Sequence, residues 1–350
     1  MRFLKLFSVV ISVMLVFSLA ACEEQGSPSA GELADDNGTV STDFDPNFHI
    51  PKKEPEVIKY TLNVYTGIEN LPEKDLVKAP MAIVVANDPT HQAGVNKADL
   101  VYEAEIEGGT TNLLAAFISA PSDLKIGPAA MGREVFADLS LSLSARLACH
   151  GVEADHAQNL LNGYTTDYIN LTDGLYAALA DGALYTNGAF LDVAAKDQSL
   201  SAPADLSPWS LFSTNRPASE TVANKVKVTF NATTITEFVY NPESKTYHRE
   251  INGAPVTDCF TGEMDNYTNL FVLNTQIIKY KDCEHLGYTL QSGSGYYVSG
   301  GGYEPITWER FGPAGPISFK DKDGNMLYTF AGRSYIALVN QNTKNTFTVE

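Results

Sequence analysis

Three short apolar runs within residues 80–134 constrain the fold more than any other part of the sequence. Residues 81–86 are almost entirely apolar and contain Ile and Val, the pattern of a strand that is buried on both faces. A second strand is predicted over residues 100–106 and a third over residues 112–119, with turn residues between them. These closely spaced strands predict a sheet at the centre of the fold.

The spacing of apolar residues changes near the middle of the chain. Helical spacing alternates with short strands in the first half, which predicts an α/β domain with a mixed sheet over residues 58–205. From residue 222 onward apolar and polar residues alternate, and Asn252-Gly253 is a hairpin signal. Residues 220–350 are therefore predicted to form a mostly antiparallel β domain, and the predicted fold class is α+β.

The first 57 residues predict export and a membrane anchor. Residues 1–21 have a basic start, an apolar core and a small-residue cleavage site, and the Leu-Ala-Ala-Cys pattern that ends at Cys22 resembles the bacterial lipobox. Cleavage there would leave Cys22 as an acylated N-terminus; an ordinary secretory signal or an uncleaved helix is the alternative. Residues 22–57 are acidic and rich in Ser, Gly, Asp and Pro, which predicts a disordered tether.

The charge of the chain limits its partners. The formal net charge is −18, and removal of residues 1–21 takes away Arg2 and Lys5 but no acid, which gives −20. Such an acidic protein is not expected to bind nucleic acid or anionic lipid surfaces. The expected location is the extracytoplasmic face of the cell membrane, held by the lipid at Cys22, with a partner in the cell wall or among envelope proteins.

The cysteines and histidines lack the spacing of a metal site. No Cys-x-x-Cys or His-x-x-x-His pattern occurs, and no glycine run ends as a phosphate loop does, so neither a metal nor a cofactor is expected. Cys149 ends an apolar run and is predicted to be a buried hydrophobic residue. Cys259 and Cys283 lie in the predicted β domain, and the sequence leaves open whether they form a disulfide.

Acidic residues at alternate positions form the first candidate site. Glu103, Glu105 and Glu107 would share one face of a strand, with neighbours about 7 Å apart. Paired acids at such separations can act on glycosidic bonds, so Glu103 and Glu107 are candidate catalytic residues. The alternative is a charged face in contact with solvent.

Two basic side chains are further candidates. Arg133 precedes a predicted helix, and its guanidinium could bind a carboxylate or phosphate of a ligand; an ion pair with Glu103 or Glu107 is the structural alternative. His150 stands at the end of a predicted apolar strand, where α/β sheets commonly bind ligands, and could act as a base. The alternative for His150 is a hydrogen-bonded residue at the edge of the core.

Aromatic residues near glycines complete the candidate set. Tyr297 and Trp308 lie in or next to a glycine-rich run and could stack on sugar rings; the alternative is a hairpin whose aromatic side chains pack in the core. Tyr185 lies in a predicted loop and is a further candidate ligand-binding residue.

Two separated motifs carry a resemblance to a known family. NKADLVYEAEIEGGTTNLLAAF, followed by KIGP and an Arg, is the first; GSGYYVSGGGYEPITWER, followed by FKDKDGNMLYTFAGRSYIALV, is the second. Together they resemble the DUF3048 family of YerB-like lipoproteins of Gram-positive bacteria. The resemblance covers about residues 80–339 and implies a two-part extracytoplasmic lipoprotein with no settled activity. Asn112 replaces an Arg usual in that family, and a family His and Asn are absent from residues 181–185.

The predicted function is therefore that of a membrane-anchored lipoprotein that binds a cell-envelope ligand without catalysis. The ligand would be cell-wall glycan, a peptide or another envelope protein, bound in a cleft between the two predicted domains. The alternative is a cell-wall hydrolase that uses Glu103 and Glu107 as glycosidase-type acid and base. The sequence leaves open whether the protein is an enzyme.

Overall fold

The computed structural model describes residues 58–350, except for residues 173, 205, 214–218 and 282. The predicted signal, Cys22 and the predicted tether lie outside the described residues. The residues that are described belong to one compact unit. None of the helices within it is both long enough and apolar enough to cross a membrane.

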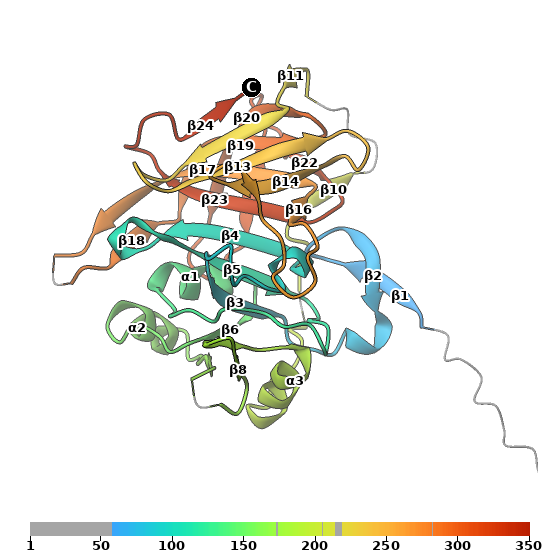
Figure 1. The fold of residues 1–350 in the computed structure, drawn as a ribbon, viewed down its shortest axis with the longest axis vertical. Helices are drawn as coiled ribbons and strands as arrows, with labels where there is room; N and C mark the ends of the chain where they lie inside the picture. Colours follow the sequence, from blue (N-terminus) through green and yellow to red (C-terminus); the bar gives the residue numbers. More distant parts are fainter. Residues whose placement is uncertain (1–57, 173, 205, 214–218, 282) are drawn as a thin grey trace, which may run out of the picture. The chain divides into compact units, whose positions relative to one another are not determined.

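A mixed sheet of twelve strands is the centre of the structure (Figure 1). Ten strands follow one another in space in this order: β11 (Thr221–Val222), β20 (Gly302–Arg310), β19 (Ser292–Ser299), β17 (Asn269–Lys279), β23 (Ser334–Asn340), β4 (Leu100–Glu105), β5 (Thr111–Phe117), β3 (Met81–Ala86), β6 (Arg146–Cys149) and β7 (Ile169–Asn170). The other two are β18 (Leu286–Thr289), which pairs with β17, and β21 (Ile317–Lys320), which pairs with β20. Strand β3 has the bounds that its apolar run predicted.

A second, antiparallel sheet is built from the C-terminal part of the chain. Its strands are β15 (Ala254–Pro255), β14 (Thr246–Ile251), β13 (Ile235–Asn241), β12 (Lys225–Thr229) and β24 (Phe347–Val349), with β16 (Asn266–Tyr267) paired to β14. The predicted hairpin signal joins β14 to β15: Asn252 and Gly253 both have positive φ, at 53° and 76°. Positive φ at both central residues is what a tight hairpin turn requires.

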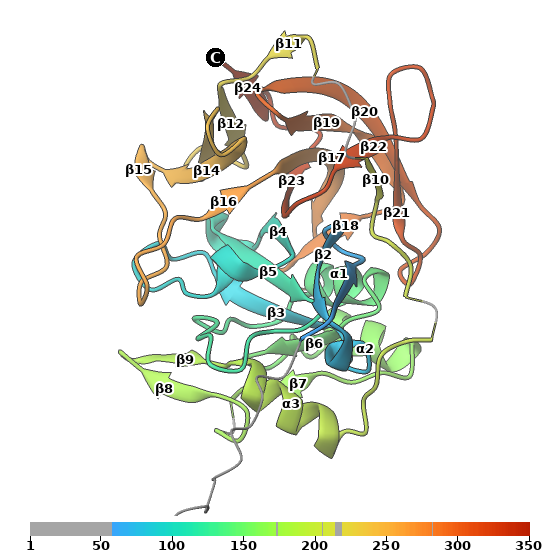
Figure 2. The same cartoon turned by 90° about the vertical axis from the view of Figure 1, so that its right-hand side faces the viewer.

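Smaller sheets, three α-helices and three short 3-10 helices complete the part that the structure describes. The small sheets pair β1 (Tyr60–Asn63) with β2 (Ile68–Pro72), β8 (Ala178–Ala180) with β9 (Ala183–Tyr185), and β10 (Leu211–Ser213) with β22 (Tyr328–Phe330). The α-helices are α1 (Glu134–Ser142), α2 (His156–Gly163) and α3 (Gly188–Asp197). Figures 1 and 2 show these helices around β3 and β6, with β12 and β14 at the opposite end.

Both faces of the large sheet are covered, which explains why its central strands are apolar at successive positions. Tyr102 of β4 belongs to a core cluster with Phe136 of α1. Its neighbour Val101 points to the other face and belongs to a second cluster, with Leu191 of α3 and Phe238 of β13. Because adjacent residues in a strand point to opposite faces, a strand between two cores needs apolar residues at both parities.

The two predicted domains share the large sheet. Strand β23, from the predicted β domain, pairs in parallel with β4, from the predicted α/β domain, with Ala337 opposite Glu103. The sheet-rich content and the mixed strand directions agree with the predicted α+β class. At this position in the large sheet, hydrogen-bonded strands connect the two predicted parts.

Candidate functional site

Glu103 lies in the interior, between the two large sheets. Its side chain accepts hydrogen bonds from Asn87 Nδ2 at 2.8 Å, Thr111 Oγ1 at 2.7 Å and Thr236 Oγ1 at 2.9 Å, and from the hydroxyl of Tyr335. Its accessible surface is 0 %. Burial raises the pKa of the Glu103 carboxyl, and the charge of Arg249 opposes this shift.

Arg249 is the buried cation of the same interior network. Its Nε lies 3.0 Å from a carboxylate oxygen of Asp265, and both side chains are fully buried. Its Nη1 donates to Asn87 Oδ1 at 3.0 Å, and its Nη2 donates to Gln92. A buried charge is tolerated when partners of this kind compensate its lost hydration. The network therefore serves to join the two sheets, since solvent does not reach it.

Glu107 and Arg133 form a separate ion pair. Arg133 Nε lies 2.9 Å and 3.0 Å from the two carboxylate oxygens of Glu107, and Nη2 also donates to this carboxylate. Burial alone would raise the pKa of Glu107, but the hydrogen bonds from Arg133 outweigh it, and the pKa lies below its usual value. The structure therefore shows the alternative considered for Arg133, an ion pair with Glu107.

The three alternating acids do not share one exposed face, which corrects the expectation from the sequence. Strand β4 ends at Glu105, and Glu107 lies in the 3-10 turn that follows. Glu105 and Glu103 do point to the same side, because Glu105 Oε1 accepts from Asn231 Nδ2 at 2.8 Å. That side is covered by the second sheet. The structure therefore does not bring Glu103 and Glu107 together as an acid and a base.

His150 lies at the surface, in contrast to Glu103. It directly follows β6 and is exposed, and its backbone N–H donates to Ala130 O at 2.9 Å. Arg133 lies on the paired segment, where Gly132 forms a bridge with Val152. The structure thus places Glu103 in the core, Arg133 in an ion pair and His150 at the surface.

The three candidate aromatic residues are buried. Tyr297 donates to Asn269 Oδ1 at 2.7 Å, and Trp308 Nε1 donates to Ser294 O at 3.2 Å. Both belong to the core cluster on the α1 side of the sheet. Tyr185 is 3 % exposed and donates to His91 O at 2.8 Å. None of the three rings presents a face to solvent on which a sugar could stack.

The thiols of Cys149 and Cys259 are free, so Cys259 forms no bridge to Cys283 in the part of the chain that the structure describes. Burial raises the pKa of Cys149 to about 12, which fits its predicted role as a buried hydrophobic residue. Among the described side chains, no group of three or more His, Cys, Asp or Glu is placed to hold a metal ion.

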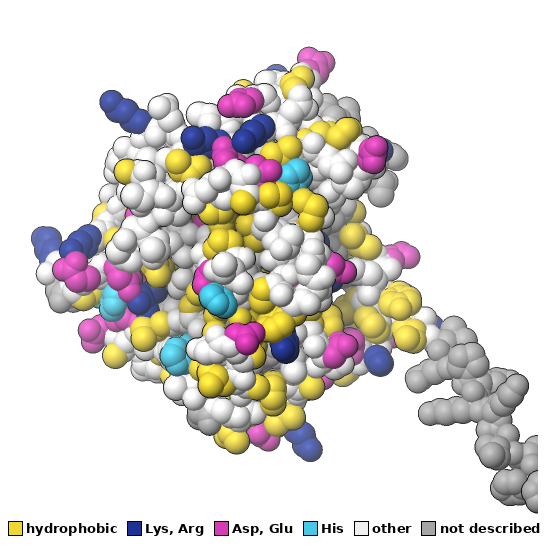
Figure 3. Space-filling model, in the orientation of Figure 1, with side chains coloured by type: hydrophobic (Ala, Val, Ile, Leu, Met, Phe, Trp, Pro, Cys, Tyr) yellow, Lys and Arg dark blue, Asp and Glu magenta, His cyan; other side chains and the backbone are white. Residues whose placement is uncertain are grey.

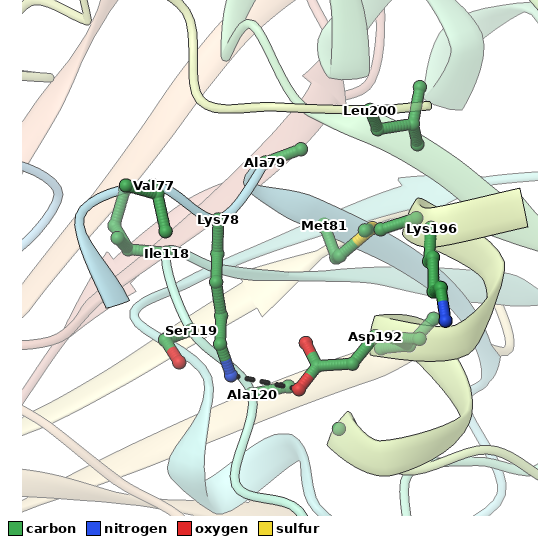
Figure 4. A pocket seen from close by; sticks show the side chains of 13 residues that line it. Val77, Lys78, Ala79, Met81, Ile118, Ser119, Ala120, Asp192, Lys196 and Leu200 are labelled. Carbon is green, nitrogen blue, oxygen red and sulfur yellow. Dashed lines mark hydrogen bonds and ion pairs between the residues drawn. The ribbon is translucent and has the colours of Figure 1, made fainter. Parts of the chain in front are cut away.

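Three adjoining cavities form an open site on the described surface. The first cavity is about 260 Å³, and Figure 4 shows Lys78 and Asp192 pairing across it. The second is about 600 Å³ and shares Lys78, Ser119, Ala120 and Asp192 with the first. The third is about 400 Å³ and shares Lys97 and Pro121 with the second. We call these three cavities the groove.

The groove follows the loop after β5 and has a distinct character at each end. The first cavity is lined by apolar residues beside its ion pair, among them Met81, Ile118 and Leu191. At the other end Lys125 Nζ lies 3.7 Å from the centre of the Phe260 ring. The middle cavity is mostly polar. An elongated ligand with both apolar and charged groups matches this sequence of surfaces.

Asp99 is the notable acid of the middle cavity. Its carboxylate accepts from Asn63 Nδ2 and from the backbone N–H of Ile118, both at 2.8 Å. Burial raises the pKa of Asp99 to about 6, against these two hydrogen bonds. Lys78 and Lys97 line the same cavity but pair with Asp192 and Glu263. The charge of Arg333 also acts to lower the pKa of Asp99, but no described side chain forms an ion pair with Asp99.

Sequence reasoning missed the groove, because its lining comes from five separated segments. These are residues 63–81, 97–99, 118–125, 188–200 and 258–261. The available signal was a pair of charged residues, Lys97 and Asp99, directly before a buried strand in the first motif. Polar residues at the end of a buried strand are placed at the edge of a sheet, where solvent can reach them.

Comparisons with known proteins agree with the two motifs. Residues 65–200 match the N-terminal domain model of the "Protein of unknown function (DUF3048)" family, and residues 226–336 match its C-terminal domain model. The chain is 28% identical over 305 residues to "Putative lipoprotein YerB" of Bacillus subtilis (strain 168), covering 81% of this chain and 88% of that protein. It is also similar to the crystal structure of YerB protein from Bacillus subtilis, with a TM-score of 0.72 and 27% identity, over 83% of this chain and 99% of the solved one.

Proposed function

Because the chain belongs to the DUF3048 family, which includes a protein named as a lipoprotein, we propose that it is a lipid-anchored envelope protein that binds a peptide ligand. The lipid would be carried by Cys22, and the protein would face the outside of the cell membrane. The ligand would be an extended peptide of the cell envelope, either a cell-wall stem peptide or a segment of an envelope protein. Binding would take place in the groove and without catalysis.

One observation carries the proposal: adjoining cavities form an elongated groove with both signs of charge. The middle cavity is lined by Lys74, Lys78 and Lys97 and also by Asp75, Asp99 and Asp192. This balance of three lysines and three aspartates stands out in a chain with a net charge of −18. A peptide presents ammonium and carboxylate groups along one backbone, so it can satisfy both signs at once.

A peptide fits the groove better than a glycan does. Sugar-binding sites typically offer aromatic rings for stacking, whereas Phe260 is the one aromatic residue that lines the three cavities. That ring is already covered by Lys125. Asp99, which lacks an ion-pair partner in the described structure, supplies a site for the ammonium group of a peptide.

The alternative of a cell-wall hydrolase has weaker support. Glycosidases need two carboxyl groups that face the same substrate bond. Glu103 is fully buried among Asn87, Thr111, Thr236 and Tyr335, and Glu107 is engaged by Arg133. Neither arrangement leaves a carboxyl group available to a polymeric substrate.

Capture from a cell-wall digest and an envelope extract tests the proposed function. The unchanged protein serves as one bait, and the Ala120→Trp variant serves as another. Ala120 lines both the first and the second cavity, so the larger Trp side chain would fill them. Ala178→Trp on the exposed strand β8 is the matched control. We expect the unchanged protein and the control to retain peptides that Ala120→Trp loses. Retention of glycan alone, or equal capture by all three proteins, would refute binding of a peptide in the groove.

A further inference from the structure

Exposed apolar side chains concentrate at the start of the described chain. Six of the nineteen large hydrophobic residues that are exposed lie within residues 58–77: Ile58, Tyr60, Leu62, Ile68, Leu76 and Val77. These residues belong to β1, β2 and the short segments next to them, and we call them the β1–β2 face. Val77 is 73% exposed and Tyr60 is 55% exposed. Exposed apolar side chains that gather in one part of a surface can mark a place of contact with a partner or a membrane.

The β1–β2 face is separate from the core that the same hairpin helps to form. Leu71 of β2 and Tyr65 in the hairpin loop point inward and belong to a core cluster. Tyr60 and Leu62 of β1 are exposed instead. Figure 3 shows the resulting group of hydrophobic side chains at the position of β1 and β2 in Figure 1. Packing of the body therefore does not account for these side chains.

The position of this face along the chain points to what covers it. Ile58 follows the proposed lipid attachment site at Cys22 by 36 residues (58 − 22). The tether that the composition predicts for this segment would span on the order of 30 to 35 Å. An anchor at Cys22 would therefore hold this face near the bilayer and would strengthen an attraction to lipid that the face has by itself.

We propose that the β1–β2 face rests on the lipid bilayer that holds the anchor, with its apolar side chains in the boundary between headgroups and acyl chains. Tyr60 suits this boundary, because its ring is apolar and its hydroxyl is polar. Lys59 and Lys74 are exposed nearby and can extend toward the headgroups. Attraction through apolar contact is consistent with the net charge of −18, which disfavours electrostatic attraction to anionic lipids.

This seating has a consequence for the groove. Leu71, Pro72 and Lys74 line its middle cavity, and Val77 lines its first cavity. The β1–β2 face and the groove therefore share a border. This consequence rests on the proposed function: a body seated in this way would meet its peptide at the membrane surface rather than deep in the cell wall.

Vesicle flotation tests the seating. Residues 58–350 form a compact unit by themselves, so they can be studied without signal and tether. We expect this body to float with uncharged phosphatidylcholine vesicles. The double change Tyr60→Ser and Val77→Ser is expected to lower the bound fraction at least fivefold. Leu179→Ser is the matched control, because Leu179 is 71% exposed on a different hairpin, and it should leave binding unchanged.

Several outcomes would overturn the seating. The body could fail to bind neutral vesicles, or its binding could require anionic lipid and disappear in high salt. The Leu179→Ser variant could also lose as much vesicle binding as the double variant does. A body that dimerises until Tyr60 and Val77 are changed would show that a second copy covers the face. If residues 58–350 bind vesicles but the longer chain of residues 23–350 does not, the segment before residue 58 covers the β1–β2 face instead. Thermal unfolding verifies that each variant is folded. Peptide capture is measured without lipid, so its result is independent of this one.

Discussion

The hydroxyl of Tyr335 donates a hydrogen bond to the carboxylate of Glu103, and this contact joins the two sequence motifs of the family. Glu103 lies on β4 and Tyr335 on β23, and the two strands pair in parallel at the centre of the large sheet. The two motifs are therefore far apart in the sequence but adjacent in space.

 Glu103 and Tyr335 are separated by 232 positions in the sequence. The buried network around Glu103 thus accounts for the presence of both motifs in one chain without assigning either of them to a ligand.

Removal of the Tyr335 hydroxyl is expected to destabilise the protein. Tyr335→Phe leaves the buried Glu103 carboxylate with one donor fewer, which should lower the free energy of unfolding by about 1–3 kcal/mol. Tyr164→Phe, at a side chain that is 43% exposed, is the control and should change it by less than about 0.5 kcal/mol. Urea denaturation measures both values. Equal effects of the two changes would contradict a stabilising role for the Glu103 network.

The ion pair between Glu107 and Arg133 predicts a stability that depends on pH. The folded-state pKa of Glu107 lies below its ordinary value of 4.5, so the contribution is present above about pH 4.5 and is lost as the pH falls through the folded-state pKa. Glu107→Gln should therefore cost about 0.5–1 kcal/mol at pH 7 and much less at pH 3. Glu284→Gln removes an exposed pair with Lys279 and should cost almost nothing at either pH. A loss for Glu107→Gln that is the same at both pH values would rule this account out.

Asp99 predicts the opposite pH dependence. Its folded-state pKa is raised from 3.8 to about 6, so its contribution to stability is fully present below pH 3.8 and is lost as the pH rises through 6. In the Asp99→Asn variant this side chain no longer titrates. The free energy of unfolding of the variant, relative to that of the unchanged protein, should therefore rise by about 1–2 kcal/mol between pH 4 and pH 7. This figure is reduced because Asp99 borders an open cavity. Urea titrations at the two pH values measure the difference, and a difference that does not vary with pH would contradict a raised pKa.

The glycine-rich run is expected to act through packing. A Cβ at Gly293 would lie 2.3 Å from Asn274 O and 2.8 Å from Trp308 Nε1. Gly293→Ala should therefore lower the free energy of unfolding by about 1–3 kcal/mol and leave peptide binding unchanged. The same change at Gly163, which ends α2 and has open space around it, should be neutral or stabilising. If Gly293→Ala kept full stability but lost peptide binding, the run would belong to the ligand site instead.

The sequence predicted individual elements well where the pattern was strong. Residues 81–86 form β3 as predicted, and Asn252-Gly253 forms the expected tight turn. These features depend on local chemistry: branched apolar side chains in a buried strand, and residues that accept positive φ in a turn. Local chemistry is fully visible in a sequence without any knowledge of the remaining chain.

The environment of Glu103 could not be predicted in the same way. Alternation along β4 correctly indicated which side of the strand Glu103 occupies, but not what covers that side. The cover includes Thr236 of β13 and Arg249 of β14, which are more than 130 positions away along the chain. The groove escaped prediction for the same reason, since tertiary contacts between distant segments create it.

Calorimetric titration of the protein with a synthetic cell-wall stem tetrapeptide that has free ammonium and carboxylate groups is the most direct test of the central claim. We expect measurable binding that weakens at least tenfold in both Asp99→Asn and Ala120→Trp and remains unchanged in Glu107→Gln. Binding that survives Ala120→Trp, or that is lost in Glu107→Gln while Ala120→Trp is unaffected, would contradict a ligand site in the groove.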